Sequence, residues 1–491
     1  MSKYALLIDI TSIQKYVFSS SKLKENLGAS YLISDLYHSL INQNEYVKDI
    51  PKTEGYIGGG NALFLFDTAY QAEEFVRKWT RSLLVNAPGI TVASAINEWD
   101  ESKFTESRKV LFDKLKESKS KFIAQTIIQR HGISAECQSD GYSMDVWSNS
   151  EEGYISAATN AKIIAFPESK KKTDEKFQDQ LKTKYSFTDL LDELGQSRGS
   201  ENHIAIVHID GNSMGDRFKE LQTLKETKQL SKDVENAIVD SFKILLDKIT
   251  AEIESGKLND YMNIKIEKGK PTKLPIRPII LGGDDVTFVC DGRLGIYYGK
   301  IFMEEFNKKY VSYGGPLSSC AGIAVIKTKY PFYKGYQLAE ELCANAKSRR
   351  RELNDKGSWL DFHITYGGFS GSLEEIREKY YRAPLGSLIY RPYKISNPAV
   401  YSFDEFLINA KKLKKEWPNN KIKELREVLT LGEDAAKTFV NETKARNLQL
   451  PHVNGEKYED NLFDSNKTKT PYFDMIELLE YYPKYLLEGE E

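Results

Sequence analysis

The chain has 491 residues, more than one ordinary hydrophobic core accommodates, so we expect two to four domains. Its 69 Lys and Arg residues nearly balance its 71 Asp and Glu residues, and the net charge of −2 excludes a general polyanion-binding protein. Any contact with nucleic acid therefore depends on local basic patches. The sequence shows no signal peptide and no apolar run long enough to span a bilayer, so we expect a cytoplasmic protein without membrane contact.

The use of cysteine and histidine argues against two further kinds of site. The cysteines are Cys137, Cys290, Cys320 and Cys343. They are scattered and form no Cys-x-x-Cys pair, which argues against a zinc ribbon and against a disulfide framework. The six histidines include no His-Asp dipeptide, so an HD-type phosphohydrolase site is not indicated.

The first part of the chain combines strand and helix patterns. Residues 4–10 are nearly all apolar and carry Asp9 near their end, which is typical of a strand buried on both faces. Gly58, Gly59 and Gly60 separate two apolar runs and predict a tight hairpin. We expect a strand over residues 4–10, a helix in the stretch through 27–32 and a hairpin over 56–66. A helix over 70–84, a strand over 89–96 and a helix over about 101–125 follow.

The middle of the chain carries fewer signals. Residues 127–200 are mixed and polar, and we interpret them as a linker domain. Within this part, residues 168–174 contain three consecutive lysines. Charge runs of this kind are usually solvated, so we expect a loop on the surface rather than a binding patch.

The pattern of the first part returns after residue 200. We expect a strand over residues 203–210, a hairpin over 277–290 and a helix over 294–310. A strand over 318–326, a helix over 334–350 and a last strand over 359–364 follow. The sequence between the first strand and the hairpin leaves room for a helix. Because the order matches that of the first part, we infer a duplicated βαββαβ domain.

Two acidic features of the second copy point to metal chemistry. Asp210 ends a buried strand, and Gly282, Gly283, Asp284 and Asp285 form the tip of the hairpin. Adjacent aspartates repel each other and add little to a turn that glycines already make, but they suit a hard cation such as Mg²⁺ or Mn²⁺ together with nucleotide phosphates. Two such ions can clamp the attacking and leaving oxygens of a phosphoryl transfer. This arrangement is typical of palm-type nucleotidyltransferases and nucleotide cyclases.

Further residues of the second copy are candidates for nucleotide contacts. Gly211, Asn212 and Ser213 form a strand-to-helix turn in which Ser213 is expected to cap the helix and backbone N–H groups to attract phosphate. Lys347 is expected to reach the triphosphate. The neighbouring Arg349 and Arg350 are interpreted as solvated cations at a helix C-terminus.

The first copy lacks the carboxylate pair. Aligning the two hairpins places Gly60 opposite Asp284 and Asn61 opposite Asp285. The first copy is therefore expected to bind a nucleotide through glycine backbone, including Gly58 and Gly59, without holding catalytic metals. Two copies packed face to face would place two nucleotides head to tail.

The sequence beyond residue 370 turns helical. We expect helices over residues 372–381, 403–417, 420–431 and 433–447. Met475, Leu478 and Leu479 indicate one last docked helix in the tail. A helical bundle is favoured over a basic surface for an RNA-bearing partner.

Together these motifs resemble one family over nearly the whole chain, the large (Cas-ten-type) Palm polymerase subunit of type III CRISPR effector complexes, nearer to the Cmr than to the Csm branch. The resemblance rests on Asp9 with Ile13-Gln14, Gly28-Ala29-Ser30, Asp210-Gly211-Asn212 with Gly215, Gly282-Gly283-Asp284-Asp285, Ala339 with Ala346-Lys347, and Arg391-Pro392-Tyr393. The Gly-Gly-Asp-Asp turn combined with Asp210 is the most specific of these elements.

The resemblance implies an α+β protein with two ferredoxin-like Palm domains, a linker domain and a C-terminal helical domain. The expected boundaries are 1–126 for the first Palm, 127–200 for the linker, 201–369 for the second Palm and 370–491 for the helical domain. Two departures from the family are expected to matter. The HD nuclease domain is missing, and the zinc cysteines of the linker are reduced to Cys137, so no zinc is expected.

The resemblance also implies synthesis of cyclic oligoadenylate from ATP, activated by target RNA in a complex with other subunits and a guide RNA. It makes Asp210, Asp284 and Asp285 the catalytic ligands of Mg²⁺ or Mn²⁺. In the first Palm it makes Gly28 and Ser30 nucleotide contacts. Some relatives join AMP to another small molecule, and that alternative stays open here.

Three other functions are alternatives to this one. A diguanylate-cyclase-like protein usually works as a homodimer with one such domain per chain, and the internal duplication argues against it. A non-catalytic scaffold has no use for clustered acids. A stand-alone nucleotide cyclase for anti-phage signalling, working outside an RNA-guided complex, remains the third alternative.

Overall fold

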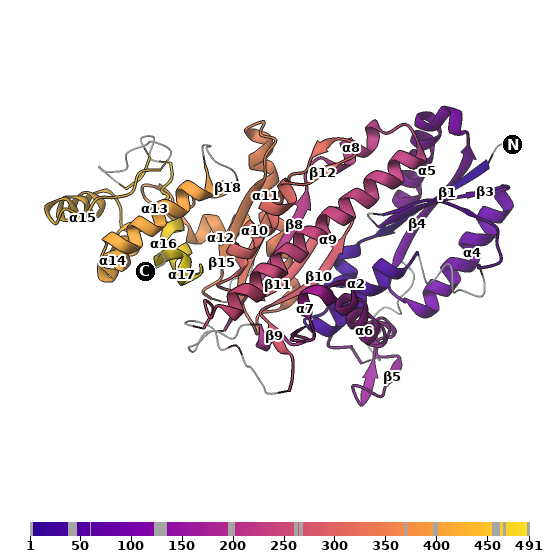
Figure 1. Cartoon of the computed structure of the whole chain (residues 1–491), viewed down its shortest axis with the longest axis horizontal. Helices are drawn as coiled ribbons and strands as arrows, with labels where there is room; N and C mark the ends of the chain where they lie inside the picture. The colour runs from indigo at the N-terminus through magenta and orange to yellow at the C-terminus, as the bar shows by residue number, and fades with distance from the viewer. Residues whose placement is uncertain are drawn as a thin grey trace.

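A computed structural model of the chain describes residues 3–37, 47–58, 60–121, 135–194, 202–259, 264, 269–367, 371–395, 401–453, 462–464 and 468–488. Figure 1 shows that the elements follow one another along the long axis of the molecule. The first sheet lies at the end with the N-terminus, the second sheet lies in the middle, and the C-terminal helices lie at the other end. Among the described residues, no helix is long and apolar enough to cross a membrane.

The first half of the chain forms a first unit, from β1 to α5, and a connecting region. The first unit consists of β1 (Lys3–Thr11), α1 (Ile13–Val17), α2 (Leu23–Asp35), β2 (Thr53–Gly58), β3 (Asn61–Phe66), α4 (Ala69–Asn86), β4 (Thr91–Trp99), a 3₁₀ turn (Glu101–Lys103) and α5 (Phe104–Lys121). The connecting region contains β5 (Val146–Ser148), β6 (Gly153–Ile155), α6 (Ala157–Lys176), α7 (Gln178–Leu181), β7 (Tyr185–Phe187) and a 3₁₀ turn (Leu191–Glu193).

The second half forms a second unit, from β8 to β15, and a C-terminal region. The second unit consists of β8 (His203–Gly211), α8 (Met214–Glu220), α9 (Leu224–Glu254), β9 (Thr272–Leu274), β10 (Ile276–Gly282), β11 (Asp285–Asp291), α10 (Gly295–Asn307), β12 (Tyr310–Val311), β13 (Gly315–Pro316), β14 (Ser319–Lys327), α11 (Phe332–Glu352) and β15 (Trp359–Ile364). The C-terminal region contains α12 (Leu373–Tyr380), β16 (Arg382–Ala383), β17 (Gly386–Ser387), β18 (Tyr393–Lys394), α13 (Phe403–Glu416), α14 (Asn419–Val428), α15 (Glu433–Ala445), α16 (Tyr472–Glu480) and α17 (Lys484–Glu488).

The two units have the same sheet topology. The first sheet has the strand order β2-β3-β1-β4, and the second begins with the equivalent order β10-β11-β8-β14 before adding β15 and β18. The register repeats as well, because Asp9 pairs with Asn61 in the first sheet and Asp210 pairs with Asp285 in the second. Both sheets are ferredoxin-like, which confirms the α+β fold and the duplication predicted from the sequence.

An ion pair repeats with the topology. In the first unit Lys119 of α5 pairs with Asp9, and in the second unit Lys347 of α11 pairs with Asp210. The helix after the last core strand thus delivers a lysine to the central aspartate in each copy. The two copies differ at the hairpin position opposite that aspartate, which is Asn61 in one and Asp285 in the other.

The lysine run of the connecting region is helical. Residues 168–174 lie inside α6, so the prediction of a solvated loop was wrong. Lysine is a good helix former, and α6 packs along α2 of the first unit. Two of the lysines are held by partners outside the helix, Lys170 by Asp189 and Lys172 by Asp35. Packing and ion pairs therefore favour a helix over residues 168–174, where the charge pattern alone predicted a loop.

The three predicted domain boundaries, near residues 126, 200 and 369, lie outside the described residues and stay predictions. The four helices predicted between residues 372 and 447 are present as α12 to α15, and the predicted last helix is present as α16. One finding was not expected. The short strand β18 pairs with β15, so the second sheet extends into the C-terminal region.

The second sheet packs different partners on its two faces. Ala205, Val207 and Ile209 of β8 share a core with α9 and α10, as the alternation of side chains along a strand requires. Ile204 and Ile206 point the other way, into a core shared with the first unit. In that core the ring of Phe18 stacks on Tyr336 of α11, with the ring centroids 3.7 Å apart. The two units therefore meet over the face of β8 that also carries Asp210.

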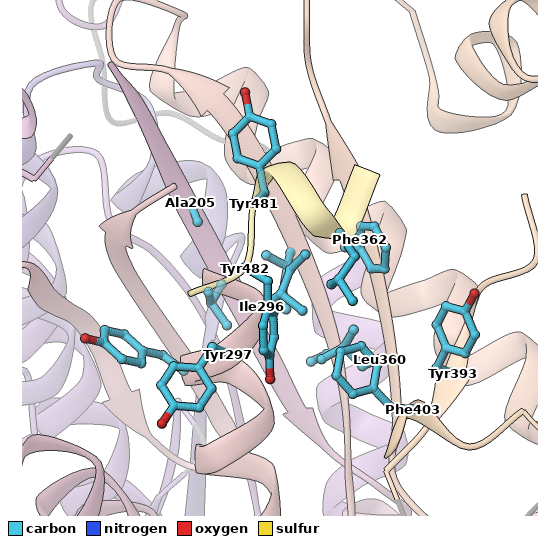
Figure 2. Packing of buried hydrophobic residues seen from close by; sticks show 14 of the residues in the cluster. Ala205, Ile296, Tyr297, Leu360, Phe362, Tyr393, Phe403, Tyr481 and Tyr482 are labelled. Carbon is cyan, nitrogen blue, oxygen red and sulfur yellow. The ribbon is translucent and has the colours of Figure 1, made fainter. Parts of the chain in front are cut away.

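The C-terminal region shares the hydrophobic core of the second unit. Figure 2 shows aromatic side chains from both parts packed around the sheet, among them Tyr297 and Phe362 of the second unit and Tyr393, Phe403 and Tyr482 of the C-terminal region. The helices that follow β18 are thus not an independent bundle. Their position is fixed against the sheet that carries the acidic residues.

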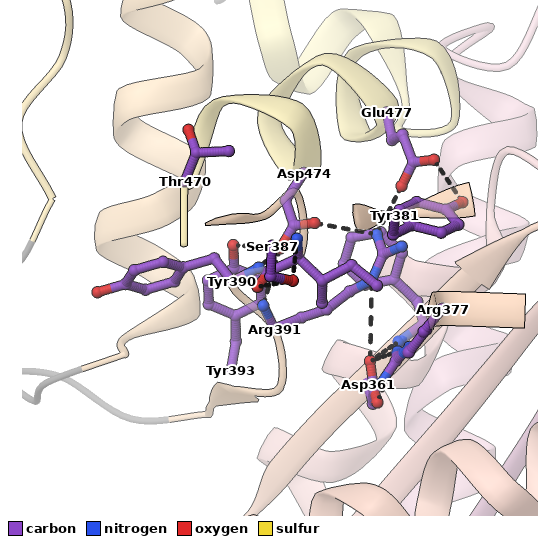
Figure 3. Close-up of polar contacts among 12 residues, drawn as sticks. Asp361, Arg377, Tyr381, Ser387, Tyr390, Arg391, Tyr393, Thr470, Asp474 and Glu477 are labelled. Atoms are coloured by element: carbon purple, nitrogen blue, oxygen red, sulfur yellow. Dashed lines mark hydrogen bonds and ion pairs between the residues drawn. The ribbon is translucent and has the colours of Figure 1, made fainter. Parts of the chain in front are cut away.

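A buried ionic cluster joins the C-terminal region to the same sheet (Figure 3). The Arg391 guanidinium donates to Glu477 of α16 over 2.6 Å and lies 3.3 Å from Asp474. Asp361 of β15 accepts two hydrogen bonds from Arg377, at 2.8 and 3.0 Å. Arg391, Asp361, Asp474 and Glu477 are all buried. Because buried charges must be matched, this cluster admits one docking geometry.

Arg391→Met is expected to destabilise the protein by about 3–5 kcal/mol, because it leaves Asp474 and Glu477 buried without their cation. The free energy of unfolding from chemical denaturation measures the loss. Arg382→Met removes an exposed pair with Glu378 and should cost less than about 1 kcal/mol. Equal stabilities of the two variants would contradict this account of the cluster.

Candidate active site

Asp210 and Asp285 lie side by side on neighbouring strands. They are direct register partners between β8 and β11, and Lys347 of α11 pairs with Asp210. The end of β8 is held from both sides. The Gly211 N–H donates to the backbone oxygen of Asp284 over 3.0 Å, and Cys320 of β14 pairs with Asp210. Three hydrogen-bonded strands therefore fix the two carboxylates that the sequence predicted to meet.

A histidine joins this pair. A ring nitrogen of His208 and one carboxylate oxygen each of Asp210 and Asp285 lie within 4.8 Å of one another. His208 is buried, and burial lowers the pKa of its imidazole to about 4, so the ring is neutral at pH 7. The sequence analysis missed this residue. The signal was present, because His208 precedes Asp210 by two positions and side chains two apart on a strand share a face.

Asp284 lies at the same turn but is not part of this cluster. Its side chain lines a cavity between the two units, and a Cβ on Gly211 would come within 3.1 Å of the Asp284 Cβ. The tight turn is made by Gly283, which has a φ of +65°. Gly282 forms the last hydrogen-bonded position of β10, opposite Asp285. Asp285 therefore belongs to the acidic cluster, and the adjacent Asp284 borders the cavity.

The carboxyl groups of this site repel each other. Burial, together with the charges of Asp210 and Asp284, raises the pKa of Asp285 to about 8. Burial and Asp210 likewise raise the pKa of Asp284 to about 6. Lys347 offsets part of this charge. The donor set of carboxylate oxygens and one imidazole fits a divalent cation such as Mg²⁺ or Mn²⁺, which would remove the repulsion.

The predicted phosphate turn follows directly after Asp210. The Asn212 N–H donates to the backbone oxygen of Ser318 over 2.8 Å, and the Asn212 side chain bonds Ser318 Oγ at 3.1 Å. Ser213 occupies the position before α8 with a φ of +58°, and its side chain makes no capping hydrogen bond. The prediction that Ser213 caps the helix was therefore wrong, because the left-handed backbone departs from the extended geometry of a capping residue.

The glycines predicted as nucleotide contacts in the first unit lie at packing contacts. A Cβ on Gly28 would come within 1.8 Å of the backbone oxygen of Lys162 in α6, and one on Gly58 within 2.1 Å of Ser231 Oγ in α9. The Ser30 hydroxyl donates to the backbone oxygen of Ile279 in β10. All three residues contact neighbouring elements, Gly58 also lines the cavity described below, and their role as nucleotide contacts stays a prediction. Gly59 lies outside the described residues.

The basic cluster at the end of α11 divides into two parts. Lys347 reaches the site through its pair with Asp210. Arg349 instead bonds Glu352 at 3.2 Å and the Tyr401 hydroxyl at 2.8 Å. Lys347 therefore lies at the acidic cluster, its contact with a triphosphate stays a prediction, and Arg349 is held at the helix end by partners outside the site.

A cavity of about 740 Å³ lies between the two units and reaches the hairpin tip at Gly283 and Asp284. The first unit contributes Tyr56, Leu63, Trp99, Phe104, Arg108 and Phe112, and the second contributes Met214, Phe218, Leu224, Thr227 and Val234. Lys109 of α5 and Lys219 of α8 add positive charge to its lining. The sequence did not predict this cavity, since it forms only where α5 of one copy meets α8 and α9 of the other.

One residue of the cavity lining links the two units directly. Arg108 of α5 donates to the backbone oxygens of Phe218, Lys219 and Leu221 at 2.8, 2.6 and 3.2 Å. These oxygens lie at the C-terminus of α8, where the helix leaves carbonyl groups without partners. Arg108 therefore links the first unit to the helix that follows the phosphate turn.

Asp285→Asn is expected to stabilise the metal-free protein at pH 8. Because the pKa of Asp285 rises from 3.8 to about 8 on folding, the native state binds the extra proton and loses stability as pH rises through this window. The variant cannot ionise. It should melt a few degrees above the wild type at pH 8 in EDTA, and the difference should shrink at pH 5. Asp216→Asn, an exposed neighbour, is the control, and equal melting of all three proteins at pH 8 would contradict the assignment.

Comparison with known proteins adds a family to this geometry. Residues 203–354 match the family described as Cas10/Cmr2, second palm domain. This segment contains β8, the hairpin, α11 and the acidic cluster. No curated protein matches the chain.

Solved structures resemble the whole chain. A Csm1–Csm4 cassette in complex with cA4 has a TM-score of 0.54 at 13% identity, over 100% of this chain and 70% of that one. The cassette in complex with AMPPNP has a TM-score of 0.56 at 14% identity, over 99% and 70%. Csm1 in T. onnurineus has a TM-score of 0.52 at 14% identity, over 100% and 70%. The chain therefore shares the fold of Csm1, and its second unit matches the second palm domain of Cas10/Cmr2.

Proposed function

We propose that the protein is a Mg²⁺-dependent nucleotidyltransferase that makes a cyclic oligoadenylate, or an AMP conjugate, from ATP. The observation that carries this proposal is the placement of Asp210 and Asp285 on one sheet face, next to a cavity that reaches Asp284 and that two duplicated units enclose. We further propose that it works in a type III CRISPR effector complex, with other subunits and a guide RNA, and that target RNA activates it.

The proposed reaction joins two nucleotides. The 3′-hydroxyl of one nucleotide attacks the α-phosphate of an ATP, and pyrophosphate leaves. A divalent cation held by Asp210 and Asp285 would supply Lewis-acid chemistry to the phosphoryl oxygens. Lys347 pairs with Asp210, which supports our proposal that it contacts the triphosphate. The two units hold both reactants in line, which removes much of the entropic barrier.

The lining of the cavity supports a nucleotide as its occupant. Aromatic and aliphatic side chains such as Tyr56, Phe112 and Phe218 offer flat apolar surface to a base. Lys109 and Lys219 lie where positive charge would meet phosphate. The hairpin tip with Asp284 borders the same space, so a base in the cavity would place its phosphates near the acidic residues.

The comparisons support the substrate class. Proteins of the same fold have been solved with cA4 and with AMPPNP, a product-like and an ATP-like molecule. The match over residues 203–354 includes every acid that the proposal uses. Assignment to the Cmr branch, the missing HD domain and a linker without zinc stay predictions. Cys137, the one cysteine of the linker, is buried with its thiol 3.7 Å from Thr159 Oγ1.

The scaffold alternative fits the site less well. A subunit that only assembles a complex gains nothing from carboxyl groups whose ionisation opposes folding, as at Asp284 and Asp285. A stand-alone cyclase would use the same residues and differs only in its partners. Purification of the protein from its source with or without a bound guide RNA separates these two contexts.

Asp284→Ala/Asp285→Ala is expected to abolish product formation, a loss of at least about a thousandfold, because the cation loses its support where charge develops. The assay incubates the protein with ATP and Mg²⁺, with and without partner subunits, guide RNA and target RNA, and identifies products by mass spectrometry. Asp216→Ala, an exposed acid of α8, is the control and should retain activity. Absence of any adenylate product from the wild type under every condition would favour the scaffold.

Thr227→Phe is expected to weaken binding of a non-hydrolysable ATP analogue by about tenfold or more, because the added ring fills the cavity where we place the base. Calorimetric titration in the presence of Mg²⁺ measures the affinity. Lys225→Phe adds the same ring to the exposed face of α9 and should bind the analogue as the wild type does. Unchanged affinity of Thr227→Phe would place the base elsewhere.

A further inference from the structure

The face of β8 and β11 that carries the acids also carries two other polar side chains. His208 pairs with Thr287 across the two strands, just as Asp210 pairs with Asp285 two positions further on. The four side chains therefore form two adjacent rungs of one ladder. The residues that precede them on this face of β8, Ile204 and Ile206, lie in the apolar core. The change from apolar to ligating side chains coincides with the end of the strand.

The spacing of the three donor atoms suits one cation. A ring nitrogen of His208 and the oxygens of Asp210 and Asp285 all lie within 4.8 Å of one another. Ligands on opposite sides of an ion with bonds of about 2.1 Å are about 4.2 Å apart. Only one pair of three ligands can lie opposite each other, and ligands at right angles are about 3 Å apart, so the three side chains must turn toward a common centre when an ion binds between them.

The imidazole is also oriented for this role. His208 Nδ1 lies 3.2 Å from the Thr287 hydroxyl, and the ring stands edge-on to Tyr336 with the centroids 5.5 Å apart. Among the described residues we find no hydrogen bond to Nε2 of this buried ring. Metal-binding histidines commonly fix their tautomer through a hydrogen bond from the other nitrogen. With Nδ1–H donating to Thr287, the lone pair of Nε2 is left for a ligand.

We propose that His208 is a third protein ligand of the cation that Asp210 and Asp285 hold, which makes the site a mixed nitrogen and oxygen site. This inference rests on the metal site of the proposed function and adds a ligand to it. Imidazole binds Mn²⁺ and Co²⁺ better than it binds Mg²⁺, which prefers oxygen. The imidazole therefore raises the affinity of the site for Mn²⁺ and Co²⁺ more than its affinity for Mg²⁺. The competing explanation is a histidine that only packs against Tyr336.

Pulsed electron paramagnetic resonance of the full chain loaded with Mn²⁺ and a non-hydrolysable ATP analogue tests the ligand directly. The wild type should show the hyperfine coupling of a directly bound imidazole ¹⁴N, and His208→Gln should lose it. His203→Gln, a buried histidine at the other end of β8, should keep it. The wild-type spectrum alone decides the question if a variant fails to fold.

Affinities provide the second readout. His208→Gln should weaken Mn²⁺ binding by at least about tenfold and leave Mg²⁺ binding within about threefold of the wild type. Bound Mn²⁺ without ¹⁴N coupling in the wild type, or coupling that persists in His208→Gln, would overturn the assignment of His208 and leave the proposed function standing. Failure of the wild type to bind either ion would overturn both.

Discussion

The site in the second unit depends on carboxyl groups that paired strands hold together against their mutual repulsion. Asp210 and Asp285 are fixed on paired strands, Asp284 lies in the hairpin turn, and burial raises the pKa of both hairpin acids. Backbone hydrogen bonds, not side-chain preferences, hold them there. Lys347 offsets part of the charge. A divalent cation bound between these carboxylates would relieve their repulsion. The same repulsion therefore favours binding of the cation that the proposed reaction needs.

The duplication explains how one site of this kind arose within a symmetric framework. In both units an aspartate of the central strand forms an ion pair with a lysine of a later helix. The pairs are Asp9 with Lys119 of α5 and Asp210 with Lys347 of α11. Only the second unit has a carboxylate at the hairpin, because Asn61 stands where the second has Asp285. The first unit contributes instead the wall of a cavity, chiefly through β2, β3 and α5. The second unit thus carries the acidic cluster, and the first unit forms part of the cavity wall beside it.

Sequence patterns predicted the parts of this architecture that local chemistry dictates. Continuous apolar strands, glycine hairpins and helical periodicity gave the duplicated fold and the pairing of Asp210 with the hairpin acids. They failed where tertiary contacts decide. The lysines of α6 are held by Asp35 and Asp189, which lie far away in the sequence. The cavity depends on contacts between the units, which motifs do not encode, whereas the spacing of His208 from Asp210 on one strand did carry a signal for its placement.

The most direct test of the central claim is a crystal structure with Mn²⁺ and a non-hydrolysable ATP analogue, with the ions located by anomalous scattering. The account predicts an anomalous peak between Asp210 and Asp285, the phosphates at the hairpin tip, and the base in the cavity between the two units. Ions bound away from these carboxylates, or a nucleotide that leaves both the cavity and the hairpin empty, would contradict it.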